Sequence, residues 1–147
     1  MVTYRLRKVD GTDEDVAEEL KELHDQTFGA SAPMILPDQG HWWLAEGRVD
    51  GEWLPAGFCG LTERPQEPSV AYLKRAAVLP WARGRRLQRR MVRVREALAR
   101  KLGIKQLVTD TTDNIPSANN LIACGYKLYR PAEPWGFTHT LYWFKEL

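Results

Sequence analysis

Short segments in which apolar residues alternate with polar ones, or run together, recur along the chain and predict seven β-strands. They cover residues 3–9, 41–46, 54–62, 70–79, 106–111, 127–130 and 138–145. The pair Asp50-Gly51 predicts a tight hairpin between the second and third segments, because both residues accept the positive φ of such a turn. Pro80 ends the fourth strand, since proline cannot donate a hydrogen bond to the strand ladder.

Three further segments have the spacing of amphipathic helices. The clearest follows Gly84 and ends before Gly103, with most of its arginines opposite an apolar stripe. The stripe consists of Leu87, Met91, Val94, Leu98 and Leu102. An earlier helix is expected to begin at Thr12, whose side chain would cap it. A short third helix is expected over residues 117–124.

The order of these elements predicts an α/β (α+β) protein built around a mixed sheet. In the second half of the chain, strands alternate with helices, and a strand–helix–strand crossover joins parallel neighbours. The earlier strands follow one another directly and are expected to pair antiparallel. A chain of 147 residues can bury roughly two-thirds of its unfolded surface. Residues 1–147 are therefore expected to form a single domain.

Composition places the chain among ordinary globular proteins, with 44% hydrophobic and 27% charged residues. The sequence contains no apolar run approaching the roughly 20 residues of a membrane span, and its first residues lack the apolar core of a signal peptide. The two cysteines, Cys59 and Cys124, have no metal-ligand spacing and are expected to be buried free thiols. We therefore expect a cytoplasmic protein with no metal and no membrane partner.

Charge is unevenly distributed, although the net charge is only +2. Residues 83–101 hold eight arginines and one lysine against the single acid Glu96, so the remainder of the chain is net acidic. The helix in this stretch begins at a strand–turn–helix junction, where unpaired backbone N–H groups attract phosphate. Farther along the helix, Arg93, Arg95 and Arg100 are expected to form a solvated face.

Two motifs connect these elements to a known family. The first ends the fourth strand and opens the arginine-rich helix, and the second surrounds the short third helix. Together they resemble the GNAT superfamily of N-acetyltransferases, whose signatures are Val-x-Pro followed by Arg-Gly-x-Gly-x-Gly/Ala, and Asn-x-x-Ser/Ala followed by a helix and Gly-Phe/Tyr. The matching positions are Val78, Pro80, Arg83, Gly84, Asn114, Ser117, Gly125 and Tyr126.

The resemblance covers nearly the whole chain and implies a GNAT-like fold. Such a fold has a central mixed, mainly antiparallel sheet of six to seven strands, splayed between strands 4 and 5 and flanked by about four helices. The resemblance also implies acetyl-coenzyme A as co-substrate, with its pyrophosphate on the turn near Gly84 and its pantetheine arm along the fourth strand. The implied cofactor-binding residues are Ala76, Ala77, Val78, Arg83, Gly84, Arg85, Arg86, Leu87, Gln88, Asn114, Ser117 and Asn119.

The implied reaction is direct transfer of an acetyl group to a primary amine in a ternary complex. The backbone N–H of Val78 would stabilise the oxyanion. The family often places a carboxylate base on the fourth strand, where this chain offers Tyr72 instead. Glu46, His41 and Ser117 are further catalytic candidates, and attack without a dedicated base stays open. The aromatic and imidazole side chains that would wall the acceptor pocket, or pack in the core, are His41, Trp42, Trp43, Trp135 and Tyr142.

Three positions depart from the family pattern. Arg86 and Gln88 stand where the second glycine and the third glycine or alanine are usual. Arg86 would either crowd the phosphate or add a charge-assisted contact to it. Leu121 stands where many members have a tyrosine that protonates the leaving thiolate, which leucine cannot do.

Two other functions stay open at this point. The missing tyrosine favours a catalytically silent coenzyme A-binding or protein-interaction member of the fold. The arginine-rich helix over residues 85–101 favours a nucleic-acid-binding module, although the rest of the chain is acidic. For an enzyme, the acceptor would be a small-molecule or peptide amine. Pairing of edge strands would give a homodimer.

Overall fold

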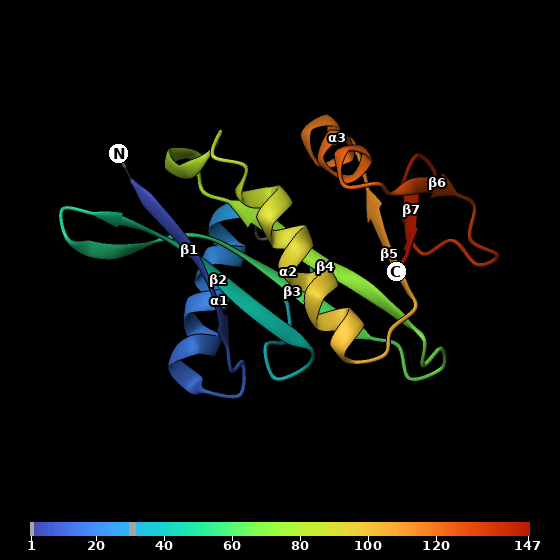
Figure 1. The fold of residues 1–147 in the computed structure, drawn as a ribbon, viewed down its shortest axis with the longest axis horizontal. Helices are drawn as coiled ribbons and strands as arrows, with labels where there is room; N and C mark the ends of the chain where they lie inside the picture. The colour runs from blue at the N-terminus through green and yellow to red at the C-terminus, as the bar shows by residue number, and fades with distance from the viewer. Residues whose placement is uncertain (1, 30–31) are drawn as a thin grey trace.

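Within residues 2–29 and 32–147, which the computed structural model describes, the chain forms a seven-stranded sheet flanked by three α-helices (Figure 1). The strands are β1 (Thr3–Val9), β2 (His41–Val49), β3 (Glu52–Glu63), β4 (Val70–Val78), β5 (Gln106–Thr111), β6 (Lys127–Tyr129) and β7 (Leu141–Glu146). The helices are α1 (Glu14–Phe28), α2 (Leu87–Lys101) and α3 (Ile115–Ala123), with a 3-10 turn at Pro80–Ala82.

The sheet is mixed and splayed, which confirms the fold expected from the sequence. Its strand order is β1-β2-β3-β4-β5-β7-β6, and β4 with β5 is the parallel pair. This pairing joins residues 70–72 to residues 106–108, and no pairing continues beyond it within the described chain. The two strands therefore separate toward the carboxyl end of β4.

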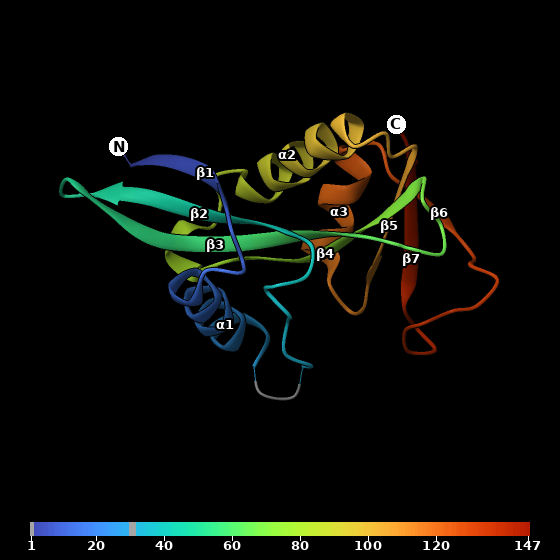
Figure 2. The same ribbon diagram turned by 90° about the horizontal axis from the view of Figure 1, so that it is seen from below.

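The helices cover both faces of the sheet. Figure 2 shows α1 on one side and α2 and α3 on the other. Each face has its own apolar core: Met91 and Leu107 belong to the core under α2, whereas Leu20 and Phe58 belong to the core under α1. About four helices were expected, and three α-helices are present in the described residues. None of these helices is long and apolar enough to cross a membrane.

The first helix begins one residue later than predicted. Asp13, not Thr12, is its N-cap, and the Asp13 carboxylate accepts hydrogen bonds from the N–H groups of Asp15 and Val16 at 3.0 and 3.1 Å. Thr12 instead donates its hydroxyl to Asp10 at 2.6 Å. Adjacent Thr and Asp residues are both good caps, so their order alone did not identify the one used.

The predicted solvent exposure of Arg95 was wrong. Its side chain is buried, with the residue only 2% exposed, and donates to the carbonyls of Met91 at 3.0 Å and Gly60 at 3.2 Å. The buried face of α2 is rotated from the predicted stripe, so that Leu102 is exposed. A strand carbonyl within reach of the guanidinium makes this burial tolerable.

His24 is a buried polar side chain with an expected pH effect. Both of its ring nitrogens are buried without a hydrogen-bond partner in the described chain, and its ring stacks on Phe28. Burial, together with the nearby charge of Arg75, lowers the pKa of His24. Below about pH 6.5 the unfolded chain binds a proton that the folded chain resists, so stability falls as the pH falls.

Replacement of His24 by leucine is expected to stabilise the fold by about 1 kcal/mol at pH 8, because it removes an unpaired polar group from the core. The gain should grow as the pH falls toward 5. Urea unfolding of the wild type and His24→Leu at several pH values measures both effects. If the stabilities of the two proteins changed in parallel with pH, His24 would not be the source of the pH effect.

Candidate active site

A cavity of about 450 Å³ lies where β4 and β5 separate. Its wall toward α2 and α3 includes Gln88, Arg95, Asn114, Ser117, Asn120 and Leu121. Its wall on the α1 side includes Phe28, Tyr72, Lys74, Arg75, Asp110 and Trp135. Ala71 and Leu73 pack in the core under α2, so the alternation of β4 sends Tyr72 and Lys74 to the α1 face. The cavity therefore crosses the sheet and can admit ligands from both faces.

The edge of β4 beside the cavity carries main-chain groups without a strand partner. The side chains of Gln88 and Arg83 donate to the carbonyls of Ala76 and Val78, at 3.5 and 3.4 Å, so these carbonyls face the splay. In an extended strand the N–H of a residue points to the same side as its carbonyl. An extended, amide-containing ligand can therefore add to this edge as another strand would.

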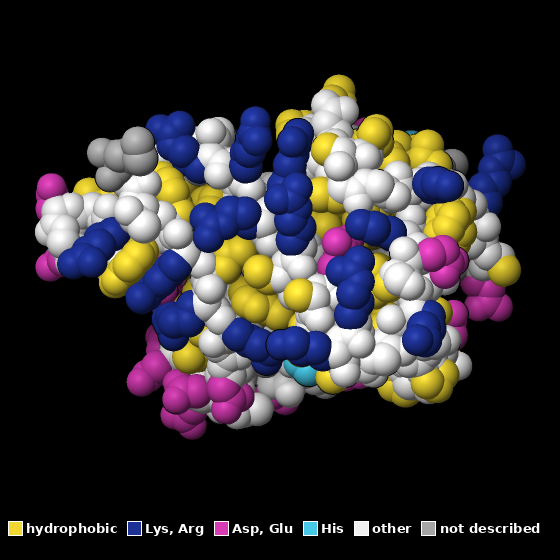
Figure 3. Space-filling view, in the orientation of Figure 1, with side chains coloured by type: hydrophobic (Ala, Val, Ile, Leu, Met, Phe, Trp, Pro, Cys, Tyr) yellow, Lys and Arg dark blue, Asp and Glu magenta, His cyan; other side chains and the backbone are white. Residues whose placement is uncertain are grey.

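The amino end of α2 presents a second set of free donors. The N-cap, Arg86, makes no side-chain capping bond, and no hydrogen bond within the described chain engages the backbone N–H groups of residues 84–89. These N–H groups lie at the positive end of the helix dipole. Figure 3 shows Lys and Arg side chains gathered on the face that carries α2. The turn and helix end are thus suited to bind a phosphate group.

Arg86 adopts the backbone conformation that explains the family's preference for glycine here. Its φ is +58° and that of Gly84 is +77°, both in the left-handed region. A residue with a side chain pays roughly 1 kcal/mol or more for this conformation, whereas glycine does not. Arg86 therefore keeps the left-handed conformation that glycine would adopt at this position, but its backbone is strained.

We expect Arg86→Gly to be more stable than Arg86→Ala by about 1 kcal/mol, because both remove the guanidinium but only glycine relieves the strain. Urea unfolding of the two variants gives this difference directly. Equal stabilities would mean that residue 86 is not held in the left-handed conformation.

Asp110 on β5 is a carboxylate of the cavity that sequence reasoning missed. One of its oxygens, Oδ2, accepts a hydrogen bond from the Tyr72 hydroxyl and another from Trp135 Nε1 at 2.7 Å. Burial, then the charge of Asp110 and the hydrogen bond to it, raises the pKa of Tyr72 far above its usual range. Tyr72 is therefore a hydrogen-bond donor, and this environment does not favour it as a base.

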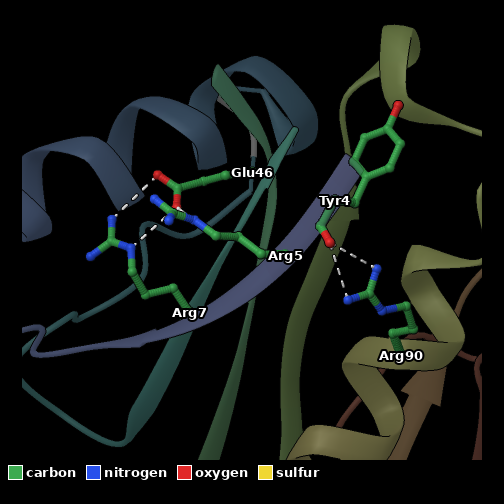
Figure 4. Close-up of polar contacts among 5 residues, drawn as sticks. All are labelled: Tyr4, Arg5, Arg7, Glu46 and Arg90. Atoms are coloured by element: carbon green, nitrogen blue, oxygen red, sulfur yellow. Dashed lines mark hydrogen bonds and ion pairs between the residues drawn. The ribbon is translucent and has the colours of Figure 1, made fainter. Parts of the chain in front are cut away.

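The structure does not bring Glu46 or His41 to the cavity. Glu46 lies on β2 and accepts from Arg5 at 2.9 Å and Arg7 at 3.1 Å, both on β1 (Figure 4). Burial opposes ionisation of Glu46, but the hydrogen bonds from Arg7 and Arg5 outweigh it and lower the pKa of Glu46. His41 is the first residue of β2, and its Nε2 lies 3.3 Å from Glu63 at the end of β3.

The predicted pocket aromatics are divided between the cavity and the core. Trp135 lines the cavity, and Tyr142 supports it with ring centroids 4.7 Å apart. Trp42 and Trp43 pack in the cores on opposite faces of the sheet. Alternation along one strand explains this separation, because consecutive side chains point to opposite faces.

The second motif spans α3 and both of its ends. Asn114 caps α3 by accepting from the N–H of Ser117 at 3.1 Å, and both residues line the cavity. Asn119 is exposed and lies outside this wall, where Asn120 takes its place and accepts from Arg89 at 3.3 Å. Leu121 is buried against the cavity, so this position supplies no proton donor.

The sheet opens between two parallel strands, the amino end of α2 has free N–H groups, and a polar pocket lies on the opposite face, so the site has room for two ligands. The sequence model of the acetyltransferase (GNAT) family matches residues 4–126. The chain belongs to this family of acyltransferases, which confirms the resemblance seen in the motifs.

Solved structures share the fold across the whole chain. An IAA acetyltransferase from Bacillus cereus has a TM-score of 0.70 at 15% identity, covering 99% of this chain and 100% of its own. A GNAT acetyltransferase from Staphylococcus aureus has a TM-score of 0.71 at 16% identity, covering 98% and 99%. The NatC complex bound to Gag peptide and CoA has a chain with a TM-score of 0.76 at 15% identity, covering 99% and 98%. A comparison with curated proteins found no match.

Proposed function

We propose that the protein transfers the acetyl group of acetyl-coenzyme A to a primary amine, by direct transfer in a ternary complex. The observation that carries this proposal is the cavity that crosses the splayed sheet. One side of it meets the free edge of β4, and the other side holds Asp110. Two substrates entering from opposite faces would meet between β4 and β5.

The residues on the α2 side fit coenzyme A. The N–H groups of residues 84–89 would hold the pyrophosphate, and Arg83, Arg85 and Arg86 are exposed beside them. The main-chain groups of Ala76 and Val78 at the splay have no strand partner in the described chain, and they would pair with the amides of the pantetheine arm in place of their weak contacts to Gln88 and Arg83. When bound, acetyl-coenzyme A supplies the acetyl group as a thioester.

The reaction balances without a further reagent. The acceptor nitrogen forms a bond to the acetyl carbon, the bond from that carbon to sulfur breaks, and one proton passes from the nitrogen to the released sulfur. The N–H of Val78 would stabilise the carbonyl oxygen, because it faces the splay with the Val78 carbonyl. Since Leu121 cannot donate, the proton would reach sulfur from the acceptor or from water.

Thermal unfolding with acetyl-coenzyme A tests the binding step. A ligand at 100 times its Kd should add about 2.7 kcal/mol to the unfolding free energy. The acetyl thioester of N-acetylcysteamine lacks the pyrophosphate and should give a much smaller shift at the same concentration. The absence of any shift with millimolar acetyl-coenzyme A would reject the proposal.

Thiol release then separates an enzyme from a silent binder. Acetyl-coenzyme A is mixed with a panel of amines that includes amino acids, polyamines and peptides, and free thiol is followed with a chromogenic disulfide. A peptide acceptor belongs in the panel because the NatC structure holds one. Binding without amine-dependent thiol release would favour the silent member, for which the leucine at position 121 is the supporting observation.

A further inference from the structure

The α1 side of the cavity carries an uneven set of charges. Lys74 and Arg75 line it from β4, and Asp110 lines it from β5. Asp110 Oδ2 accepts two hydrogen bonds, whereas no hydrogen bond in the described chain engages Oδ1. A carboxylate has roughly four lone-pair sites, so Asp110 retains acceptor capacity toward the cavity.

The two cations have no ion-pair partner among the described residues. No carboxylate of the described chain lies within 4.0 Å of the charged nitrogens of Lys74 or Arg75. Burial, then the charge of Arg75, lowers the pKa of Lys74, and the charge of Asp110 opposes this shift only in part. Both side chains are half-buried, where a charge is less well solvated than at the open surface, so this pair has unused capacity for an anion.

Arg75 is held at the cavity by an unusual backbone. It is the extra residue of a β-bulge in β4, with a φ of +44°. Its guanidinium lies 5.0 Å from the Phe28 ring centroid and donates to the Pro33 carbonyl at 3.2 Å. Its Nε is buried with no hydrogen-bond partner in the described chain. Strained bulge residues that aim a side chain are common at functional sites.

We infer that the acceptor is a small amine that also carries a carboxylate, such as an α-amino acid. This inference rests on the proposed function. The amino group would donate to Asp110 Oδ1, and the carboxylate would be bound by Lys74 and Arg75. The charges of such a ligand are complementary to the two cations and the one anion on the α1 side of the cavity. An amine with no acidic group would leave both cations unpaired.

Aromatic side chains complete the site. Phe28, Trp135 and Phe137 line the cavity, and they would contact the apolar part of the acceptor. Tyr72 and Trp135 are positioning residues, because their bonds to Oδ2 hold the carboxylate with Oδ1 turned to the ligand. Tyr142 in turn holds the Trp135 loop by accepting from the Gly136 N–H at 2.7 Å.

A matched set of acceptors tests the inference: phenylalanine, its amide, and 2-phenylethylamine, with a parallel set built on leucine. Rates of thiol release are normalised to the neutral fraction of each amine. Charge-assisted hydrogen bonds to a carboxylate should raise kcat/KM for the amino acid roughly 10- to 100-fold above that of its amide.

Variants test which residues produce the preference for the amino acid over its amide. Lys74→Met and Arg75→Gly should each lower the ratio of amino acid to amide toward one, and glycine retains the backbone of the bulge. Asp110→Asn should lower kcat/KM for amino acid and amide alike, by about 100-fold. Tyr72→Phe should lower kcat more than it raises KM.

Lys21→Met is the matched control, because Lys21 lies on the exposed side of α1, and this variant should behave as wild type.

Two failures are distinguishable. If acetyl-coenzyme A stabilises the protein but amides, plain amines or peptides react as well as amino acids, this inference is overturned and the proposed function stands. If acetyl-coenzyme A gives no stabilisation, the proposed function itself fails. All variants are first compared for acetyl-coenzyme A binding, which a correct assignment leaves within about twofold of wild type.

Discussion

Replacement of Lys145 by methionine is expected to lower the free energy of unfolding by about 3 kcal/mol. Lys145 Nζ lies 3.0 Å from Glu96 Oε2 and donates to the Cys124 carbonyl at 2.8 Å. The side chain of Glu96 is only 6% exposed, and its Oε2 accepts a hydrogen bond from the Tyr126 hydroxyl at 2.8 Å. Methionine would preserve the length of the side chain but leave a buried carboxylate without its cation.

Urea unfolding of Lys145→Met measures this loss, with Lys127→Met as the control. Lys127 is exposed on β6, and its replacement should change stability by less than about 0.5 kcal/mol. Adding Glu96→Gln to Lys145→Met removes the unpaired charge and should recover about 1–3 kcal/mol. If Lys145→Met and Lys127→Met were equally stable, the ion pair would contribute nothing.

This network explains why the second motif ends in Gly-Tyr. Gly125 has a φ of +90° directly after α3, and Tyr126 then turns back into the core. The Tyr126 hydroxyl joins α3 to Glu96 on α2, and Lys145 joins both to β7. The motif therefore fixes the helix that carries Asn114 and Ser117 against the helix that carries the free N–H groups.

The order of the elements along the chain and the turn at the start of α2 could be predicted from the sequence because their signals are local. Asp50-Gly51, Pro80 and the alternating segments mark elements without reference to the rest of the chain. The bulge at Arg75 could not be found in this way. It depends on the register between β3 and β4, which no single segment contains.

The α1 side of the cavity was the part that local reasoning could not assemble. Asp110 is one acid among many in the sequence, and its role depends on the pairing of β4 with β5, which places it near Tyr72. The expectation of a base on the fourth strand or the hairpin offered Tyr72, Glu46 and His41, and Glu46 is paired with two arginines of β1. The sequence signal that did exist was Asp110 at the end of a buried strand.

Replacement of Gly84 by valine is expected to raise the Kd for acetyl-coenzyme A by about 10- to 100-fold. Space is not the obstacle, because a Cβ at this position would meet nothing within 4 Å. The obstacle is the φ of +77°, which a β-branched residue rarely adopts. The turn would change conformation and displace the N–H groups of residues 84–89, which the proposal assigns to the pyrophosphate.

Gly51→Val is the matched control for this experiment. Gly51 has a φ of +82°, and a Cβ there would also meet nothing within 4 Å, but this glycine lies at the tip of the β2–β3 hairpin. Both valine variants should therefore lose similar stability, and Gly84→Val alone should lose affinity in isothermal titration. Gly84→Asn should fall between them, because asparagine accepts the left-handed region more readily. A wild-type Kd in a folded Gly84→Val protein would remove the pyrophosphate from this turn, and the free N–H groups of α2 would need another ligand.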